Sequence, residues 1–200
     1  MIYRVTETFE TEIAKFTRSP FAIAVDSCTN AIFLSLIYIG IKGLRITIPN
    51  HTYVSVPCSI IHAGGKVGFE PSSKILKGAY QLKPTPVWDS ALRLTSNMYI
   101  PETFMCLSFS GAKKPIKLGK GGMILTDNEN AYKWFKKARY IGRNEIDLLK
   151  DNFDFIGWNF YMLPELAING LRQLSVLPKN LPDVEGEYPN LNQFPIYANS

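Results

Sequence analysis

The sequence predicts an α/β fold in which a mostly parallel sheet is flanked by helices. Short apolar strand patterns alternate with helical patterns from about residue 5 to residue 177, and glycine or proline separates many of them. This alternation is typical of βαβ units, whose crossover connections make neighbouring strands parallel. The chain has 200 residues, of which 46% are hydrophobic, enough to bury a single core. We therefore expect residues 1–177 to form one large α/β domain.

The first half of the chain shows three strand patterns and three helix patterns. A helix is predicted at 5–16, because Val5, Phe9, Ile13 and Phe16 fall on one helical stripe. The elements expected next are a strand at 21–25, a helix opened by residues 26–29 and running to 39, a strand at 45–48, a helix at about 53–62 and a strand at 66–69.

The second half is less regular. Residues 71–84 are predicted to be a loop with little regular structure, followed by strands at 87–88, 104–109 and 123–125. The capping-box pattern at 126–129 predicts the start of an amphipathic helix, and a further helix is predicted at 164–177. Residues 178–200 are rich in Pro and Asn, and we expect a tail or an extended arm.

Composition narrows the classes of function. The net charge is +5, but the lysines are spread along the chain, and the basic cluster at 133–139 fits a solvated helix face better than a nucleic-acid site. The three cysteines lack metal-ligand spacing and there are only two histidines, so no metal site is expected. Unpaired thiols, an acidic N-terminal segment and the lack of a long apolar run favour a cytoplasmic protein without a membrane span.

Two strand ends carry the residue types of a pyridoxal phosphate site. The strand pattern at 104–109 leads to Lys113, and the short apolar run at 86–88 ends in Asp89. A lysine amine can hold the cofactor's aldehyde as a Schiff base, and an acid can keep the ring nitrogen protonated. Lys114, Lys117 and Lys120 lie close by, so spacing alone does not choose the lysine, and a basic surface loop fits equally. Asp89 could also be a simple N-cap.

Further candidates fall just after other strands. The segment Ser27–Thr29 opens a helix, where free amides and the helix dipole favour a phosphate, although a plain N-cap explains it as well. Tyr53 could lie on a flat cofactor or could simply pack. Ser108 could donate to a phosphate or satisfy local backbone. Ligands of such sheets bind beyond the carboxyl ends of the strands, which supports taking these residues together.

With these residues in place, the chain resembles the DegT/DnrJ/EryC1/StrS family of sugar aminotransferases, which has the aspartate aminotransferase (type I) fold. Family patterns such as SSGTAALHLAL, VPSFTFVAT, EDAAQ, FSFHPTKNLTTGEGG, RNHGR and GYNYRM are matched, in this order, by residues 26–36, 48–56, 88–92, 107–122, 139–143 and 157–162. Each match is short, but their shared order makes the resemblance specific.

The resemblance implies a role for each candidate and a reaction. It makes Lys113 the Schiff-base lysine and Asp89 the partner of the pyridine nitrogen. The remaining implied cofactor contacts are Tyr53 on the ring, and Cys28, Thr29, Ser108 and a partner subunit's Asn159 at the phosphate. The implied protein is a homodimer with a shared site. It would move an amino group from an amino acid, usually glutamate, to a keto-sugar nucleotide.

Departures from the family pattern leave alternatives open. Leu92 replaces the family glutamine, Tyr161 replaces an arginine, and the region between Gly65 and Pro86 is short. From the sequence after Leu177, we expect the family's small C-terminal domain to be missing. Other pyridoxal phosphate chemistry, such as dehydration or racemisation, and a degenerate, non-catalytic binding or partner subunit are therefore the alternatives. A nucleic-acid module is the weakest interpretation.

Overall fold

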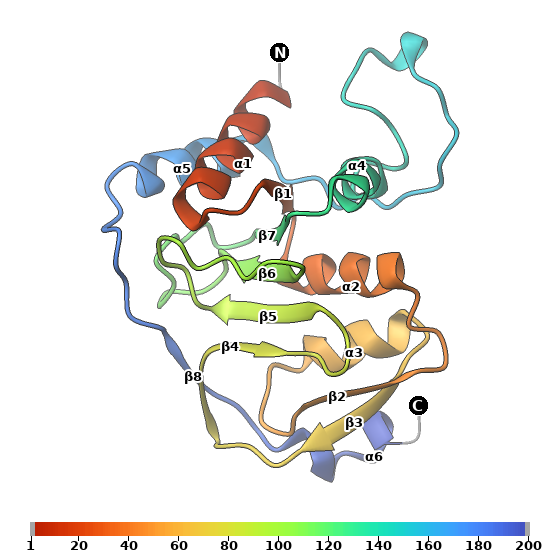
Figure 1. Cartoon of the computed structure of the whole chain (residues 1–200), viewed down its shortest axis with the longest axis vertical. Coiled ribbons are helices and arrows are strands. Elements are labelled where there is room, and N and C mark those ends of the chain that lie inside the picture. The colour runs from red at the N-terminus through yellow and green to blue at the C-terminus, as the bar shows by residue number, and fades with distance from the viewer. Residues whose placement is uncertain (1–2, 199–200) are drawn as a thin grey trace.

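The computed structural model describes residues 3–198, which are built on one six-stranded sheet (Figure 1). The sheet order is β1 (Phe21–Val25), β7 (Gly122–Thr126), β6 (Phe104–Ser108), β5 (Val87–Leu92), β4 (Ile75–Gln81) and β8 (Glu185–Glu187). A separate two-stranded parallel sheet joins β2 (Arg45–Pro49) and β3 (Lys66–Glu70).

Helices cover the sheet on two sides. The helices are α1 (Tyr3–Thr17), α2 (Cys28–Ile39), α3 (Ser55–His62), α4 (Glu129–Ala138), α5 (Pro164–Leu174) and the short α6 (Pro195–Ala198), with single 3₁₀ turns at Leu148–Lys150 and Leu191–Gln193. α1 and α5 pack against each other on one side, and α2, α3 and α4 lie toward the other (Figure 1). The predicted helices are therefore present, with the last one ending at Leu174 rather than 177.

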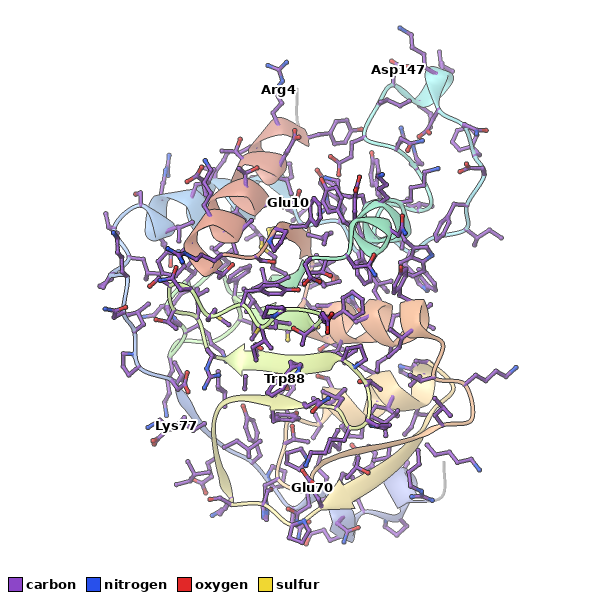
Figure 2. The ribbon with its side chains drawn as sticks, viewed as in Figure 1. Arg4, Glu10, Glu70, Lys77, Trp88 and Asp147 are labelled. Atoms are coloured by element: carbon purple, nitrogen blue, oxygen red, sulfur yellow. The ribbon has the colours of Figure 1, made fainter. Side chains whose placement is uncertain are left out.

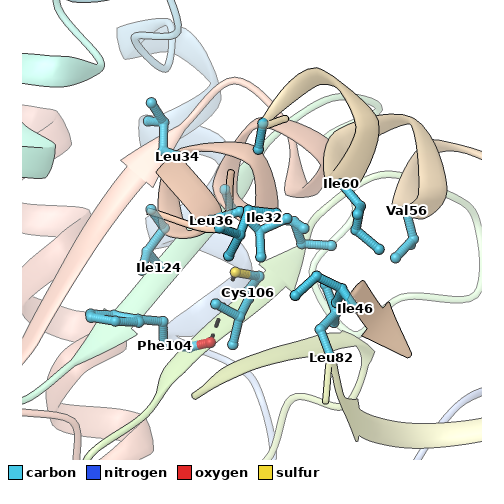
Figure 3. Packing of buried hydrophobic residues seen from close by; sticks show 14 of the residues in the cluster. Ile32, Leu34, Leu36, Ile46, Val56, Ile60, Leu82, Phe104, Cys106 and Ile124 are labelled. Carbon is cyan, nitrogen blue, oxygen red and sulfur yellow. Dashed lines mark hydrogen bonds between the residues drawn. The ribbon is translucent and has the colours of Figure 1, made fainter. Parts of the chain in front are cut away.

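The central strands divide the interior into two cores. Along β6, Phe104 and Cys106 belong to the core under α2, whereas Met105 and Leu107 belong to the core under α1 and α5. This split follows from the two-residue period of a strand, which sends alternate side chains to opposite faces. Figure 3 shows the first core, in which Cys106 lies among the aliphatic side chains of α2 and its neighbours.

The α/β class is confirmed, but the sheet is less parallel than expected. β5 pairs with β6 in parallel, while β1–β7, β6–β7, β4–β5 and β4–β8 are antiparallel. Residues 82–86 and 109–121 turn back directly between neighbouring strands, so β4–β5 and β6–β7 run antiparallel, whereas residues 93–103 cross over without a helix and leave β5 and β6 parallel. Mixed direction therefore replaces the predicted succession of βαβ units beyond β3.

The prediction of an irregular loop at 71–84 is wrong, because β4 occupies residues 75–81 of that segment. Gly78 has a φ of +73° and the register with β5 shifts between Gly78 and Tyr80, so this strand contains a bulge. A bulge interrupts the simple alternation by which a strand is recognised in a sequence, and the flanking lysines reduce its apolar character further.

The segment after α5 packs along the body of the protein. Within the described part, residues 178–198, β8 extends the sheet and Leu191 is buried; residues 199–200 lie outside the description. Arg93 fixes the start of the segment by donating from Nε and Nη2 to the two carboxylate oxygens of Asp183, over 2.8 and 2.6 Å. The segment is thus an extended arm that lies on its own chain.

Two details of the helix starts matter for function. Ser27 caps α2, and its hydroxyl oxygen accepts a hydrogen bond from the Asn30 amide. α4 begins after Asn128, whose side chain accepts a hydrogen bond from the Ala131 amide, so the cap is Asn128 rather than Thr126.

Among residues 3–198, no helix combines the length and apolar character needed to cross a bilayer.

Candidate active site

A cavity of about 390 Å³ opens where β5, β6 and the start of α2 meet. Its walls include residues from the start of α2, the loop before α3, β4, β5, the loop after β6 and the C-terminal arm. The volume is within the range of small-molecule sites. Of the residues singled out in the sequence, the cavity brings together Cys28, Thr29, Tyr53, Asp89 and Ser108.

The start of α2 forms one wall. Ser27, Cys28 and Thr29 all line the cavity there, at the positive end of the helix dipole. The Thr29 hydroxyl donates to Ser55 Oγ over 2.9 Å, and the Cys28 thiol donates to the Cys106 carbonyl over 3.4 Å. Lys120 adds a positive charge at this wall, although it also pairs with Asp26 at 3.1 Å. The wall is suited to an anion such as a phosphate.

Asp89 lies on β5 and is only 6% exposed. Its Oδ1 accepts from the Ala91 amide and its Oδ2 accepts from the Tyr80 hydroxyl, both over 2.9 Å. Burial raises the pKa of the Asp89 carboxyl, while the two hydrogen bonds and the charge of Lys114 act in the opposite direction. A buried carboxylate beside a cavity is a natural partner for a cationic ring nitrogen.

Lys77, Lys114 and Lys120 line the cavity, and Lys114 is the one whose charge acts on Asp89. Its side chain is half-buried, its Nζ donates to the Ala91 carbonyl, and it is near enough to Asp89 and Cys28 to interact electrostatically with both. Burial lowers the pKa of the Lys114 amine, although Cys28 and Asp89 oppose this shift. Lys113 is exposed and is not part of the described cavity wall. A neutral amine is the nucleophilic form, so the environment of Lys114 favours reactivity.

Two tyrosines, Tyr53 and Tyr188, also line the cavity. Tyr53 is 57% exposed, and its ring centre is 6.2 Å from that of Tyr188, with the ring planes at 68°. Tyr188 follows β8, so the arm supplies part of the wall. Burial, followed by Asp89 and Cys28, raises the pKa of Tyr188 to about 12. Each tyrosine therefore offers a ligand in the cavity a flat ring and a hydroxyl group.

The remaining predicted residues divide between the cavity and the surface. Ser108 lines the cavity, and its oxygen accepts from the Ser110 amide over 3.3 Å. Leu92, which stands in place of the family glutamine, is buried at the same wall. Asn159 is exposed, forms a backbone β-bridge with Tyr140, and is not among the residues that line the cavity of its own chain.

Across residues 3–198, no group of three or more His, Cys, Asp or Glu side chains could hold a metal ion.

The family model of the DegT/DnrJ/EryC1/StrS aminotransferases matches residues 1–74 and 101–184. The chain belongs to this family. The stretch 75–100, which holds β4 and β5 and therefore both Tyr80 and Asp89, falls between the two matched regions. The placement of Asp89 thus depends on the geometry rather than on the family match. A comparison with curated protein sequences returns no match.

Solved structures of similar fold include several aminotransferases. A Streptococcus pneumoniae protein described as a sugar aminotransferase, in its PMP form, has a TM-score of 0.73 and 19% identity over 87% of this chain and 59% of its own. The Helicobacter pylori aminotransferase PseC, involved in the biosynthesis of pseudoaminic acid, has a TM-score of 0.71 and 16% identity over 86% and 57%. An aminotransferase from Psychrobacter cryohalolentis has a TM-score of 0.66 and 19% identity over 86% and 56%. The chain therefore spans less than two thirds of the length of these proteins.

Pyridoxal phosphate is the cofactor of the DegT/DnrJ/EryC1/StrS aminotransferases, and the residues of the cavity fit it. The start of α2 offers an anion site, Asp89 offers a buried acid, and Lys114 offers an amine of lowered pKa. These groups line a single cavity, as a molecule with a phosphate, a ring nitrogen and an aldehyde requires.

Among the cavity residues, sequence reasoning did not single out Tyr80 or Tyr188, and the resemblance pointed to Lys113 rather than Lys114. Tyr80 was hidden in the segment predicted to be a loop, and Tyr188 in the segment predicted to be a tail. Lys114 was among the four nearby lysines, and no periodicity in the loop distinguishes it from Lys113. The stretch Glu-Gly-Glu at 185–187 carries no strand signal, because Gly and Glu are depleted in strands, so the sequence did not indicate that β8 would order Tyr188.

Proposed function

We propose that the protein is a pyridoxal phosphate-dependent aminotransferase that moves an amino group from an amino acid, with glutamate as the donor, to a keto-sugar nucleotide. One observation supports this most strongly: a buried acid and an amine of lowered pKa line the same cavity as the start of α2. Membership of the family supports the reaction class. The sugar aminotransferases among the structural relatives support the acceptor class.

Each residue has a distinct part in this proposal. Lys114 would hold the cofactor through its side-chain amine, the group that can bind an aldehyde covalently. When bound, the cofactor supplies an electron-accepting ring, and Asp89 keeps a proton on the nitrogen of that ring. The amides at the start of α2 and the hydroxyl of Ser108 hold the phosphate. As a free amine, Lys114 would also be placed to move a proton at the donor's α-carbon.

The proposed assembly is a homodimer with a shared site. Asn159 is exposed and lies outside the cavity of its own chain, so it is available to a neighbouring copy. It is on the return of an excursion between α4 and α5 that extends away from the body, with Asp147 at the outer end (Figure 2). We infer that this excursion contacts the second subunit and brings Asn159 to the partner's phosphate site.

The test is to add pyridoxal phosphate to the purified protein and to the variants Lys114→Ala and Lys113→Ala. We expect the wild type and Lys113→Ala to develop a visible absorption band from the lysine-bound cofactor, and Lys114→Ala to lack it. Reduction with borohydride, followed by peptide mass mapping, identifies the modified lysine without any measurement of activity. Addition of glutamate should then bleach the band as the first half of the transfer proceeds.

The outcomes separate the possibilities. A band that is lost only in Lys113→Ala would restore Lys113 as the reactive lysine and leave the cofactor chemistry intact. If the wild type forms no band, the aminotransferase proposal fails, and a non-catalytic partner subunit becomes the better explanation. A band without any response to a panel of amino donors would favour other pyridoxal phosphate chemistry.

A further inference from the structure

Tyr80 lies directly opposite Asp89 in the antiparallel pairing of β4 with β5. Opposed residues of an antiparallel pair project from the same face of the sheet, so their side chains meet. The Tyr80 hydroxyl donates to Asp89 Oδ2 over 2.9 Å, and both residues line the cavity. Tyr80 lies in the stretch 75–100 that the family model leaves unmatched.

A third residue completes a hydrogen-bonded chain. Thr52 is 1% exposed, and its hydroxyl is hydrogen-bonded to the Tyr80 hydroxyl. Because Tyr80 gives its own proton to Asp89, the hydroxyl proton of Thr52 is directed to Tyr80. The order of donation is therefore Thr52 to Tyr80 to Asp89, and such chains strengthen the terminal bond by polarisation.

This chain affects where a proton rests in the occupied cavity. A buried acid facing a pyridine nitrogen can share its proton in two ways, as carboxylate with a protonated ring or as neutral acid with a neutral ring. Burial favours the neutral pair, since it disfavours charge. A hydroxyl that donates to the carboxylate favours the charged pair, because it stabilises the ionised acid.

We propose that Tyr80, supported by Thr52, is a positioning residue that holds Asp89 as a carboxylate and so keeps the proton on the cofactor's ring nitrogen. The proposal rests on the proposed function for its cofactor. It also explains how an acid at this depth acts as an ion-pair partner in a cavity where Leu92 provides no polar contact.

The Ala91 amide also donates to Asp89 from the backbone, but among residues 3–198 Tyr80 is the only side chain with a hydrogen bond to this carboxylate. Cys28 on α2, Cys106 on β6 and Tyr188 on the arm all have a raised pKa, with burial as the main cause, so they stay neutral near pH 7. Lys114 acts on Asp89 through its charge, but its own hydrogen bond goes to Ala91. Burial, and then Asp89, raise the pKa of Tyr80 well above its usual value, so Tyr80 keeps its donor proton.

The first test follows Asp89 in the cofactor-free protein by NMR of ¹³C-labelled aspartate. Tyr80→Phe keeps the ring and removes only the donor, so we expect the pKa of Asp89 to rise by about one unit, a tenfold change in proton affinity. Thr52→Val should raise the pKa of Asp89 by a smaller amount, and Thr52→Ser, which keeps the hydroxyl, should leave that pKa at the wild-type value. An unchanged pKa of Asp89 in Tyr80→Phe overturns the proposal.

The second test adds pyridoxal phosphate labelled with ¹⁵N in its ring. We expect the ring nitrogen to be protonated in the wild type and to shift toward the unprotonated form in Tyr80→Phe, while the cofactor's Kd changes little. Identical ¹⁵N shifts in the two proteins overturn the proposal, as a role limited to packing would predict. A wild type that binds no cofactor instead refutes the proposed function, and the aspartate titration then still shows whether Tyr80 acts on Asp89.

Discussion

At the scale of single residues, the start of α2 is held in place by backbone packing as well as by its cap. Gly122, the first residue of β7, lies directly against it. A Cβ at this position would be 2.4 Å from the carbonyl carbon of Ser27 and 2.5 Å from the nitrogen of Cys28. Real Cβ atoms do not approach backbone so closely, so any side chain here would displace the helix start. The anion wall of the cavity therefore depends on this glycine.

We accordingly expect Gly122→Ala to weaken cofactor binding and to destabilise the fold by about 1–3 kcal/mol, the usual cost of overpacking. Thermal unfolding and a titration with pyridoxal phosphate measure the two effects. Gly119→Ala is the matched control, because Gly119 has a φ of +75° but open space around its Cβ position. The control should lose stability through backbone strain alone and keep its affinity for the cofactor. Equal affinities in both variants would contradict the role given to Gly122.

The sequence indicates some of the cavity residues but not all of them. Cys28 and Thr29 open α2 and Ser108 ends β6, as expected, whereas Asp89 lies within β5 rather than after it; all four line one cavity. Choosing between Lys113 and Lys114 requires the path of an irregular loop, which no periodic pattern encodes. The partner of Asp89 was equally hidden, because Tyr80 reaches it across a bulged strand rather than along the chain.

At the scale of elements, a buried network of charges links the end of α4 to α1, to β1 and to Glu145. Arg139 follows α4 and is fully buried. Its Nη1 donates to Glu10 of α1 and to the Ala24 carbonyl of β1, and its Nη2 donates to Glu145 Oε1 over 2.6 Å. Lys136 pairs with both Glu10 and Glu145, at 3.2 and 2.8 Å. Removing one partner from such a network leaves buried charge uncompensated.

We expect Glu145→Gln to lower the free energy of unfolding by about 2–3 kcal/mol at pH 7, where the wild-type carboxylate is ionised. Burial acts to raise the pKa of Glu145, but Arg139 and Lys136 outweigh it and lower that pKa. The stabilisation is therefore fully present above the unfolded-state value of about 4.3 and is lost as the pH falls through the lowered folded-state value.

Urea unfolding of the two proteins between pH 3 and 7 measures this difference. The gap between wild type and Glu145→Gln should be widest at neutral pH and should shrink below about pH 4. Glu129→Gln is the control, since Glu129 lies on the surface of the same helix region and its pair with Lys133 is exposed. A constant gap across the whole pH range would exclude the ionised Glu145 as the source of the effect.

The sequence predicts where helices and strands lie better than it predicts whether neighbouring strands run parallel or antiparallel. Helices with a continuous apolar stripe, such as α1 and α4, lie where their periodicity indicates. Strand direction depends on whether a connection crosses over or turns back, and that is set by tertiary packing in the loops at 82–86 and 109–121.

At the scale of the whole molecule, the excursion between α4 and α5 exposes much apolar surface. Leu149 and Ile156 are each 93% exposed, and Phe153 is 67% exposed. The cyan segment in Figure 1 carries these residues away from the sheet. Apolar side chains gathered on one projecting segment are typical of an interface, which agrees with the proposed homodimer.

We expect light scattering to show a dimer for the wild type and a monomer for the double variant Leu149→Asp/Ile156→Asp, because charge at these positions opposes burial in an interface. The monomer should also bind pyridoxal phosphate more weakly, since it lacks the partner's Asn159. Val176→Asp is the control, because Val176 is 81% exposed outside the excursion. A dimer that persists in the double variant would place the interface elsewhere.

The wall that Tyr188 contributes has a consequence for how the protein is made. Cys28 and Tyr188 line the same cavity, although 160 positions separate their numbers in the chain. During synthesis the N-terminal elements can begin to pack while the later ones are still missing. The cavity cannot be enclosed until β8 has emerged from the ribosome and paired with β4. Cofactor capture therefore follows the synthesis of the arm, and a nascent chain that lacks the arm would present an open, solvent-filled site.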